Sequence, residues 1–315
     1  MKRILVLGAT GDQGHPLLTR LIAAGMTPVA ALRNPKALAG TEFAAVETVA
    51  ADIYDEASMI AAAAGMDGIA AHLPFVFDRA KAQQMGANIA AAGRANGVQK
   101  IVFHTSCHIA EADIGSPAMD GRRDIIAAIA GSGCGWAIIE SRVFMDNMIR
   151  SWNKPGIVNK GVFAYPAKPD LKISWICLDD VAAFMVEALA NPDLPSGRYR
   201  VGGPEALVGD EVAAVLSEAA GRPITFKSLT PDDFASAMSL LVTGSPDVQP
   251  LSIYDGMAAF YRWYNAQPQS PLVVDPAEMA RHFAHRPASL ATWAARQDWN
   301  DPRDPALATR MAGMG

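Results

Sequence analysis

The N-terminal stretch MKRILVLGATGDQG, residues 1–14, contains the pattern that decides the fold class. Ile4 to Leu7 form a continuous apolar run, typical of a parallel strand buried on both faces. The three glycines of GATGDQG, residues 8–14, follow at once, and a helical stripe begins at Leu17. Such a strand, glycine turn and helix place the pyrophosphate of a dinucleotide at the helix N-terminus, although a purely structural glycine turn is the alternative. The cofactor-binding residues predicted from this loop are Gly8, Thr10, Gly11, Asp12, Gln13 and Gly14.

The same alternation of strand and helix continues to about residue 150. Further strands are predicted at 28–32, 45–50, 68–73, 100–104 and 136–139, and helices at 56–64, 79–96 and 120–130. Repeated units of this length are typical of a parallel sheet covered on both faces by right-handed crossovers. We therefore predict an α/β fold, a doubly wound parallel (Rossmann) sheet, with a cofactor domain at residues 1–151.

Residues 152–315 are predicted to form mainly a smaller C-terminal α/β substrate lobe. Prolines and glycines crowd the stretch from 155 to 169, and the rhythm changes there. A strand at 173–178 and a helix from 180 onward are expected to return in part to the main sheet, so residues 173–190 are shared with the first domain. The last residues, 300–315, lack periodicity and predict an exposed tail.

The composition narrows the classes of partner. The chain has 315 residues, of which 50% are hydrophobic, and a net charge of -5, which excludes disorder and argues against a nucleic-acid partner. Its three cysteines form no C-x-x-C pair, which suits a reducing, cytoplasmic environment. No apolar run reaches the length of a membrane helix or a signal-peptide core. We expect a small-molecule substrate and leave a homodimer open.

The residues after the second predicted strand bear on the choice of cofactor. Leu32 is followed by Arg33, and Lys36 lies three residues further on, with no acid between Ala30 and Lys36. Arg and Lys suit the 2′-phosphate of NADP, whereas NAD sites offer a carboxylate to the ribose. This predicts NADP(H), the alternative being that both are solvated surface charges. Asp52, after the third strand, is expected near the adenine.

Several further segments resemble the NmrA-like group of atypical short-chain dehydrogenases/reductases. The matching pieces are GATGDQG at 8–14, LRNPKA at 32–37, KIVFHTS at 100–106, AIIESRVFMDNM at 137–148, DDVAAFMVEAL at 179–189 and the stretch 199–226. The resemblance covers roughly residues 1–235 and implies NADP(H) in a cleft between a cofactor sheet and a smaller lobe. The family contains both reductases of quinones, activated double bonds, dyes or ketones and regulators that bind the dinucleotide without turnover. Fold alone does not choose between them.

The chain departs from the usual catalytic pattern of short-chain reductases, Tyr-x-x-x-Lys. The corresponding helix offers Ala118 and Arg122, or Met119 and Arg123 in the other register, so the phenol that donates the proton is absent. Arg122 is predicted to clasp the nicotinamide ribose or the phosphates, with an exposed helical arginine as the alternative. The catalytic candidates are Ser106, Arg122 and His108, the histidine because its ordinary pKa permits proton donation.

A missing acid still permits hydride transfer to an acceptor that delocalises the charge, provided that the site positions the substrate. The resemblance implies that Leu73, Pro74, Phe75, Phe144 and Asn147 flank the nicotinamide, and Thr105 is a further predicted cofactor contact. Substrate contacts are predicted for Phe75, His108, Phe144, Tyr254 and Tyr261, although clustered aromatics also form cores. His282 and His285 have no third ligand nearby, so no metal site is predicted. The leading hypothesis is an NADP(H)-dependent reductase of a small electron-poor compound, and the rival is a dinucleotide-sensing regulator.

Overall fold

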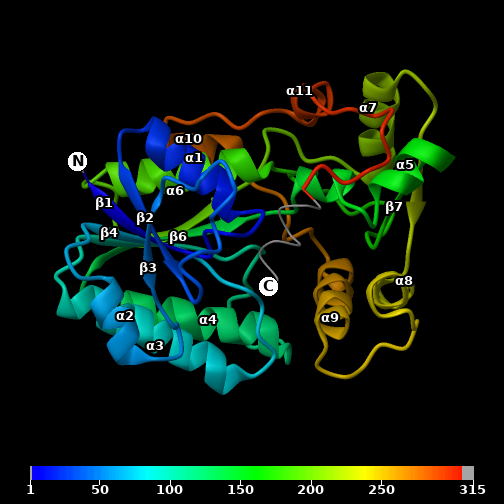
Figure 1. The fold of residues 1–315 in the computed structure, drawn as a ribbon. Helices are drawn as coiled ribbons and strands as arrows, with labels where there is room; N and C mark the ends of the chain where they lie inside the picture. The colour runs from blue at the N-terminus through cyan, green and yellow to red at the C-terminus, as the bar shows by residue number, and fades with distance from the viewer. Residues whose placement is uncertain (1, 307–315) are drawn as a thin grey trace.

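The computed structural model describes residues 2–306 and is built around a seven-stranded parallel sheet (Figure 1). Its strands are β1 (Arg3–Leu7), β2 (Thr27–Leu32), β3 (Glu47–Ala50), β4 (Gly68–His72), β5 (Lys100–His104), β6 (Gly135–Ser141) and β8 (Gly197–Val201). Their order is β3-β2-β1-β4-β5-β6-β8, with every neighbouring pair parallel. The order reverses between β1 and β4, the switch point at which such sheets bind ligands. The predicted fold class is confirmed.

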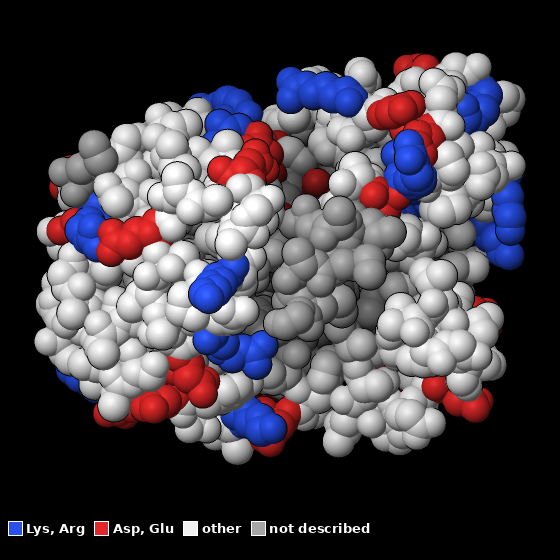
Figure 2. Space-filling view, in the orientation of Figure 1, with Lys and Arg blue, Asp and Glu red and all other residues white. Residues whose placement is uncertain are grey.

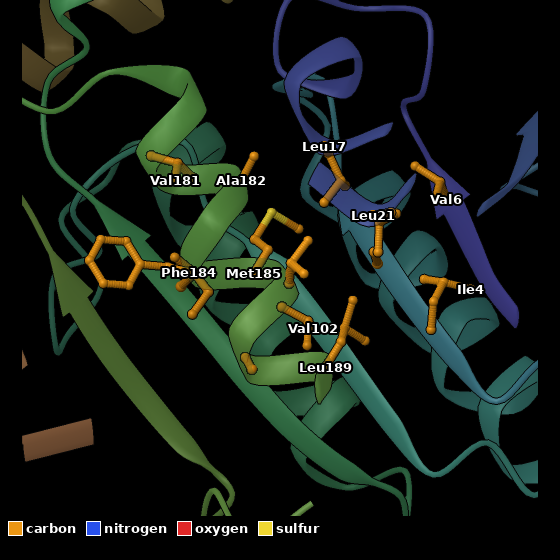
Figure 3. Close-up of a cluster of buried hydrophobic side chains, with 14 of the residues drawn as sticks. Ile4, Val6, Leu17, Leu21, Val102, Val181, Ala182, Phe184, Met185 and Leu189 are labelled. Carbon is orange, nitrogen blue, oxygen red and sulfur yellow. The ribbon is translucent and has the colours of Figure 1, made fainter. Parts of the chain in front are cut away.

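Helices cover both faces of this sheet (Figure 1). One face carries α1 (Gly14–Ala23), α6 (Leu178–Ala190) and α10 (Pro276–His282), and the other carries α2 (Glu56–Ala62), α3 (Arg79–Ala95) and α4 (Pro117–Ala130). Because strand side chains alternate, Ile4 and Val6 pack with Leu21 of α1 and Phe184 of α6, as Figure 3 shows. Leu5 and its alternate neighbours face α2, α3 and α4. The apolar run of β1 therefore fills two cores.

The second lobe has its own small sheet and its own core. The remaining elements are η1 (Met145–Ile149), α5 (Lys154–Lys160), β7 (Val162–Tyr165), α7 (Gly209–Ala220), β9 (Thr225–Ser228), α8 (Pro231–Thr243), α9 (Ile253–Ala266) and α11 (Leu290–Ala294). Strands β7 and β9 pair in parallel. Phe163, Tyr165 and Trp175 are almost fully buried beside them and contact one another edge to face or stacked.

Two elements of the second half differ from the prediction. Residues 173–178 form no strand and make only isolated bridges, Phe144 with Ile176 and Ile173 with Leu207, because this buried segment links the two lobes. The strand that joins the main sheet is β8, which the apolar periodicity did not predict and which only the resemblance over residues 199–226 implied. Arg198 and Arg200 alternate with its apolar residues, the pattern of an edge strand solvated on one face.

In the part of the expected tail that the structure describes, residues 300–306, Asp304 is buried and the other residues are exposed or partly exposed. Asp304 is only 7% exposed, and its carboxylate accepts a hydrogen bond from Ser151 N at 2.9 Å and pairs with Arg150 at 3.5 Å. The rest of the predicted tail, residues 307–315, lies outside the described residues.

No helix within residues 2–306 combines the length and the apolar character that crossing a membrane requires. On the described part of the face in Figure 2, basic and acidic side chains are interspersed and form no continuous basic surface.

Candidate active site

The glycine loop turns sharply from β1 into α1 at the carboxyl edge of the sheet. Gly8 has a φ of 82°, and Gly11 N donates to Gly8 O at 3.3 Å, while Gly14 N donates to Gly11 O at 2.9 Å. A Cβ on Gly14 would lie 2.3 Å from Gly8 O, which no side chain tolerates. The glycines therefore leave a close backbone cradle at the start of a ten-residue helix. This cradle, which a Cβ would fill, fits the pyrophosphate of a dinucleotide.

The other loop residues differ in what they contact. Thr10 is partly exposed. Asp12 pairs with Arg150 at 3.1 Å, so its carboxylate fixes the loop to the segment after η1. Gln13 caps α1 without a side-chain bond to the helix and instead accepts a hydrogen bond from Ser106 Oγ at 2.9 Å. The loop is thus tied to both neighbouring elements of the site.

Arg33 and Lys36 follow β2, which neighbours β1, and Asp52 follows β3, the next strand outward. Both cations are exposed. Lys36 N donates to Asn34 Oδ1 at 3.1 Å, which fixes the turn between them. Asp52 is exposed as well, and its Oδ1 accepts from Tyr54 N at 3.0 Å. The structure therefore places two cations, free of ion pairs in the described chain, on the side of the sheet where a ribose phosphate would lie.

His72 is a residue of the site that the sequence analysis missed. It ends β4 directly beside the glycine loop, and a Cβ built on Gly8 would lie 2.4 Å from its ring. Burial, with a smaller contribution from Arg122, lowers the pKa of His72 to about 4, so the ring is neutral. The signal that would find it is the register, because Leu7 pairs with Ala71 and the next residue of each strand must meet.

Thr105 and Ser106 follow β5 but have different surroundings. Ser106 lines a cavity and has a φ of 63°, a left-handed conformation that costs a non-glycine residue energy. Thr105 is fully buried, and its hydroxyl donates to Cys107 O at 2.6 Å. The predicted cofactor contact of Thr105 is therefore not available to its side chain, which instead stabilises the turn that carries Ser106.

Arg122 lies beneath the site rather than at its surface. Its guanidinium is 2% exposed, donates to Leu73 O and lies 4.4 Å from the ring centroid of Phe75. Burial lowers the pKa of Arg122 to about 10. Because protein atoms cover it, the predicted clasp on the nicotinamide ribose is not supported by this arrangement. Arg122 instead supports the loop of Leu73, exposed Pro74 and half-buried Phe75 from below.

A cavity of about 220 Å³ begins at Ser106 and lies between the two lobes. It is lined by residues 75 and 77 after β4, 106–108 after β5, 142–144 after β6, Asn147, one face of α9 and Leu272. Four of the five residues predicted to contact substrate line it, namely Phe75, His108, Phe144 and Tyr261. Tyr254, the fifth, is partly exposed on α9 outside this lining. The cavity is large enough for a small flat ring system.

A chain of hydroxyl and amide groups borders the cavity. Asn147 Nδ2 donates to the Tyr165 hydroxyl at 3.3 Å, and the hydroxyls of Tyr165 and Tyr261 lie 2.5 Å apart. Burial raises the pKa of Tyr165 to about 12 and that of Tyr261 well above its ordinary value. Both phenols are therefore protonated at neutral pH. Tyr165 is the last residue of β7 in the second lobe, and nothing in the local sequence pointed to it.

Cys107 and His108, the two residues after Ser106, also line the cavity. The His108 ring stacks on Trp263 with the centroids 5.7 Å apart. Burial, and then the positive charges of Arg142, Arg200 and Arg198, lower the pKa of His108 to about 3. His108 is therefore neutral, and the expected donation from an imidazolium at neutral pH is not available to it. Burial raises the pKa of the Cys107 thiol to about 12.

The helix that carries Tyr-x-x-x-Lys in typical short-chain reductases is α4, and it offers no phenol here. Ala118 and Met119 are 3% and 1% exposed and pack into the core of the second lobe. His282 and His285 contact different partners. His285 pairs with Asp180 at 2.8 Å, whereas His282 packs against Tyr199. Within residues 2–306, no group of three or more ligand side chains is arranged for a metal ion.

Comparisons with known proteins place this arrangement in context. The chain is 32% identical over 260 residues to an NAD(P)H azoreductase of Xenophilus azovorans, covering 82% of this chain and 86% of that protein. It is also 32% identical over 237 residues to a (4-alkanoyl-5-oxo-2,5-dihydrofuran-3-yl)methyl phosphate reductase of Streptomyces griseus, covering 75% and 80% of the two chains.

A solved structure shares the fold over almost the whole chain. The NADPH-dependent quinone oxidoreductase of Escherichia coli, in complex with NADPH, superposes with a TM-score of 0.75 at 23% sequence identity and covers 93% of this chain and 98% of that chain. The model of the NmrA-like family matches residues 1–284, which include the glycine loop, both sheets and α9. By sequence and by fold, the chain belongs to the NmrA-like family.

Proposed function

We propose that this protein is an NADPH-dependent reductase of a small, electron-poor and conjugated compound such as a quinone, an enone or a conjugated ketone. The observation that carries the proposal is the position of the cavity. It begins at Ser106, whose hydroxyl donates to Gln13 of the glycine loop at 2.9 Å. A substrate in the cavity would lie beside a dinucleotide held by that loop.

The cavity walls suit a flat, apolar ring. Phe75 and Phe260 contact each other with ring centroids 5.1 Å apart and a tilt of 59°, so they form one continuous part of the wall, and Phe144 lines the side near β6. Aromatic walls bind flat ligands through dispersion and exclude water from the space between them. The ordered positions of these rings support positioning as the main contribution of the protein to catalysis.

The chain's hydroxyl groups suit an acceptor that does not need a strong acid. NADPH, when bound, supplies the hydride. Ser106 and Tyr261 line the cavity, and the phenol of Tyr261 keeps its proton at neutral pH. The Tyr261 hydroxyl can donate to a carbonyl oxygen when Tyr165 donates to Tyr261, whereas the one proton of Ser106 is given to Gln13. Conjugation spreads the charge that arrives on the substrate. The absence of the phenol on α4 is compatible with such substrates.

The preference for NADPH over NADH rests on Arg33 and Lys36. Both are exposed at the carboxyl end of β2, with no acidic side chain among residues 30–36. A 2′-phosphate would gain two charge-assisted contacts there, and a ribose hydroxyl would find no carboxylate partner. Two relatives named for the reduction of azo compounds and of a furanone phosphate support reduction as the reaction class.

The test is turnover with purified protein. We expect oxidation of NADPH, followed by its absorbance, when quinones, enones and conjugated ketones are supplied in turn. Ser106→Ala, which keeps the fold but removes the bond to Gln13, should lower kcat/KM by at least about tenfold. Binding of NADPH without turnover across the whole panel would contradict the proposal.

The replacement of the phenol on α4 by the buried Ala118 or Met119 favours one rival, a regulator that binds the dinucleotide without consuming it. A regulator must bind the reduced and oxidised cofactor with unequal affinity, because a ligand that binds two states equally shifts nothing. Calorimetric titration with NADPH and NADP⁺ measures that ratio. A large ratio together with no turnover supports the regulator, whereas turnover supports the reductase.

A further inference from the structure

Arg142 lines the cavity from the end of β6, immediately after Ser141. Its side chain is 2% exposed. The backbone N donates to Val201 O at 3.1 Å, and Nη1 donates to Glu140 O at 3.2 Å. Nε is buried without a hydrogen-bond partner. Among the described residues, one hydrogen bond holds the guanidinium in place, so most of its five N–H donors are left for another partner.

The charges around Arg142 do not cancel. Arg198 pairs with Glu140 and, at 2.7 Å, with Glu111, and Arg200 pairs with Glu111 at 3.0 Å. This cluster contains three guanidinium groups, including Arg142, and two carboxylates. Both carboxylates are engaged by Arg198 and Arg200, and Arg142 forms no ion pair within the described chain. Glu140, whose Oε2 has no hydrogen-bond partner, favours the charged form of Arg142 through space and so compensates it in part. By formal count, one of the three positive charges in this cluster still has no carboxylate.

The rest of the cavity wall offers Arg142 no counter-charge. Its lining contains no aspartate or glutamate among the described residues, and its other members are aromatic, aliphatic or neutral polar side chains. His108 is uncharged, because its surroundings disfavour the imidazolium. A buried cation in an apolar cavity is costly unless an anion completes it. A ligand that carries the anion would supply the partner that the protein lacks.

We propose that the substrate is an aromatic or conjugated ring that bears an anionic substituent, a carboxylate, sulfonate or phosphate, and that Arg142 binds this substituent. The inference rests on the proposed function, because it assigns the substrate class of the same cavity. The ring lies among the phenylalanines near Ser106, and the anion accepts hydrogen bonds from the guanidinium at the β6 side. Arg142 is thus a specificity determinant rather than a proton donor.

The test compares two ligands that differ in charge alone, 2-naphthoate and 2-naphthamide. Their affinities are measured by calorimetry on the full chain saturated with NADP⁺, which has no hydride to give, so binding is read without turnover. We expect wild type to bind the carboxylate at least about tenfold more tightly than the amide, the size of one charge-assisted contact. Arg142→Met should abolish this preference, and Arg142→Lys should retain part of it.

Arg200→Met is the matched control. It removes the same charge from the same cluster, but Arg200 is 47% exposed at its side chain and lies outside the cavity lining, so the preference should survive. Circular dichroism shows whether Arg142→Met folds. If it does not fold, the proposal is still tested by the affinities of wild type and of Arg142→Lys for the two ligands. Equal wild-type affinity for the two ligands, or an undiminished preference in Arg142→Met, overturns the proposal. A protein that shows the preference but never oxidises NADPH refutes the proposed reductase activity and not this binding site.

Discussion

Replacement of Arg33 by alanine should weaken NADPH binding and leave NADH binding unchanged. A charge-assisted hydrogen bond to a phosphate contributes about 1.5–3 kcal/mol, and each 1.4 kcal/mol is about a tenfold change in Kd. Arg33 is exposed, and Lys36 remains nearby in the single variant, so the lower end of this range applies. We expect about a tenfold loss of NADPH affinity for Arg33→Ala and about a hundredfold loss for the double variant with Lys36→Ala.

Calorimetric titration of NADPH and NADH into both variants measures these changes. The control is Arg94→Ala, which removes the same charge from an exposed position in the last turn of α3, at the opposite edge of the sheet. It should alter neither affinity beyond a general charge effect that salt removes. Equal losses for NADPH and NADH in Arg33→Ala, or no loss for either, would refute the assignment of Arg33 to the 2′-phosphate.

Three further predictions concern stability and the glycine loop. His72 and His104 end β4 and β5, and His108 lines the cavity; burial lowers the pKa of all three, so as the pH falls the unfolded chain takes up protons at these histidines before the folded chain does. Each of these histidines therefore contributes its full stabilisation only above about pH 6.5. Below that pH, the free energy of unfolding should fall by about 1.4 kcal/mol per pH unit for each histidine. Urea midpoints that do not change between about pH 7.5 and about pH 5 would contradict the burial of these side chains. Ser106→Gly should be more stable than Ser106→Ala by up to about 1 kcal/mol in thermal unfolding, because only glycine relieves the φ of 63°, and equal stability would count against that conformation. Gly14→Ala should lower the free energy of unfolding by about 1–3 kcal/mol, because its Cβ would lie 2.3 Å from the loop backbone. Gly11→Ala, whose Cβ would lie 3.5 Å from its nearest neighbour, should unfold like wild type but bind NADPH more weakly. An equal loss of stability in both variants would show that the cradle is not as described.

The first half of the fold could be predicted because its signals are local. The apolar run before Gly8 and the glycines after it specify a strand, a turn and a helix without reference to distant residues. The failures lie where long-range contacts decide. Residues 173–178 are as apolar as a strand, but they are buried between the lobes and pair only at isolated positions. Apolar periodicity missed strand β8 because Arg198 and Arg200 interrupt the pattern, and only the neighbouring β6 makes it a strand.

The site residues that could be predicted are those that follow the carboxyl ends of the strands. Ser106, Phe144 and Asn147 follow strands, and the structure brings all three to the cavity. Sequence reasoning could not show that Arg122 points inward under Phe75, because helix register alone does not reveal which neighbours cover a side chain. Nor could sequence reasoning single out Arg142, because its proposed role depends on Arg198 of the neighbouring strand β8, which pairs with Glu140.

The protonated thiol of Cys107 has a consequence for the chemistry that the cavity can tolerate. Quinones and enones accept hydride, but the same electrophilic carbons alkylate thiolates. With a pKa of about 12, the fraction of Cys107 present as thiolate at neutral pH is on the order of 10⁻⁵. If the substrate is a quinone or an enone, Cys107 should therefore react with it only slowly, because burial disfavours the thiolate that would attack.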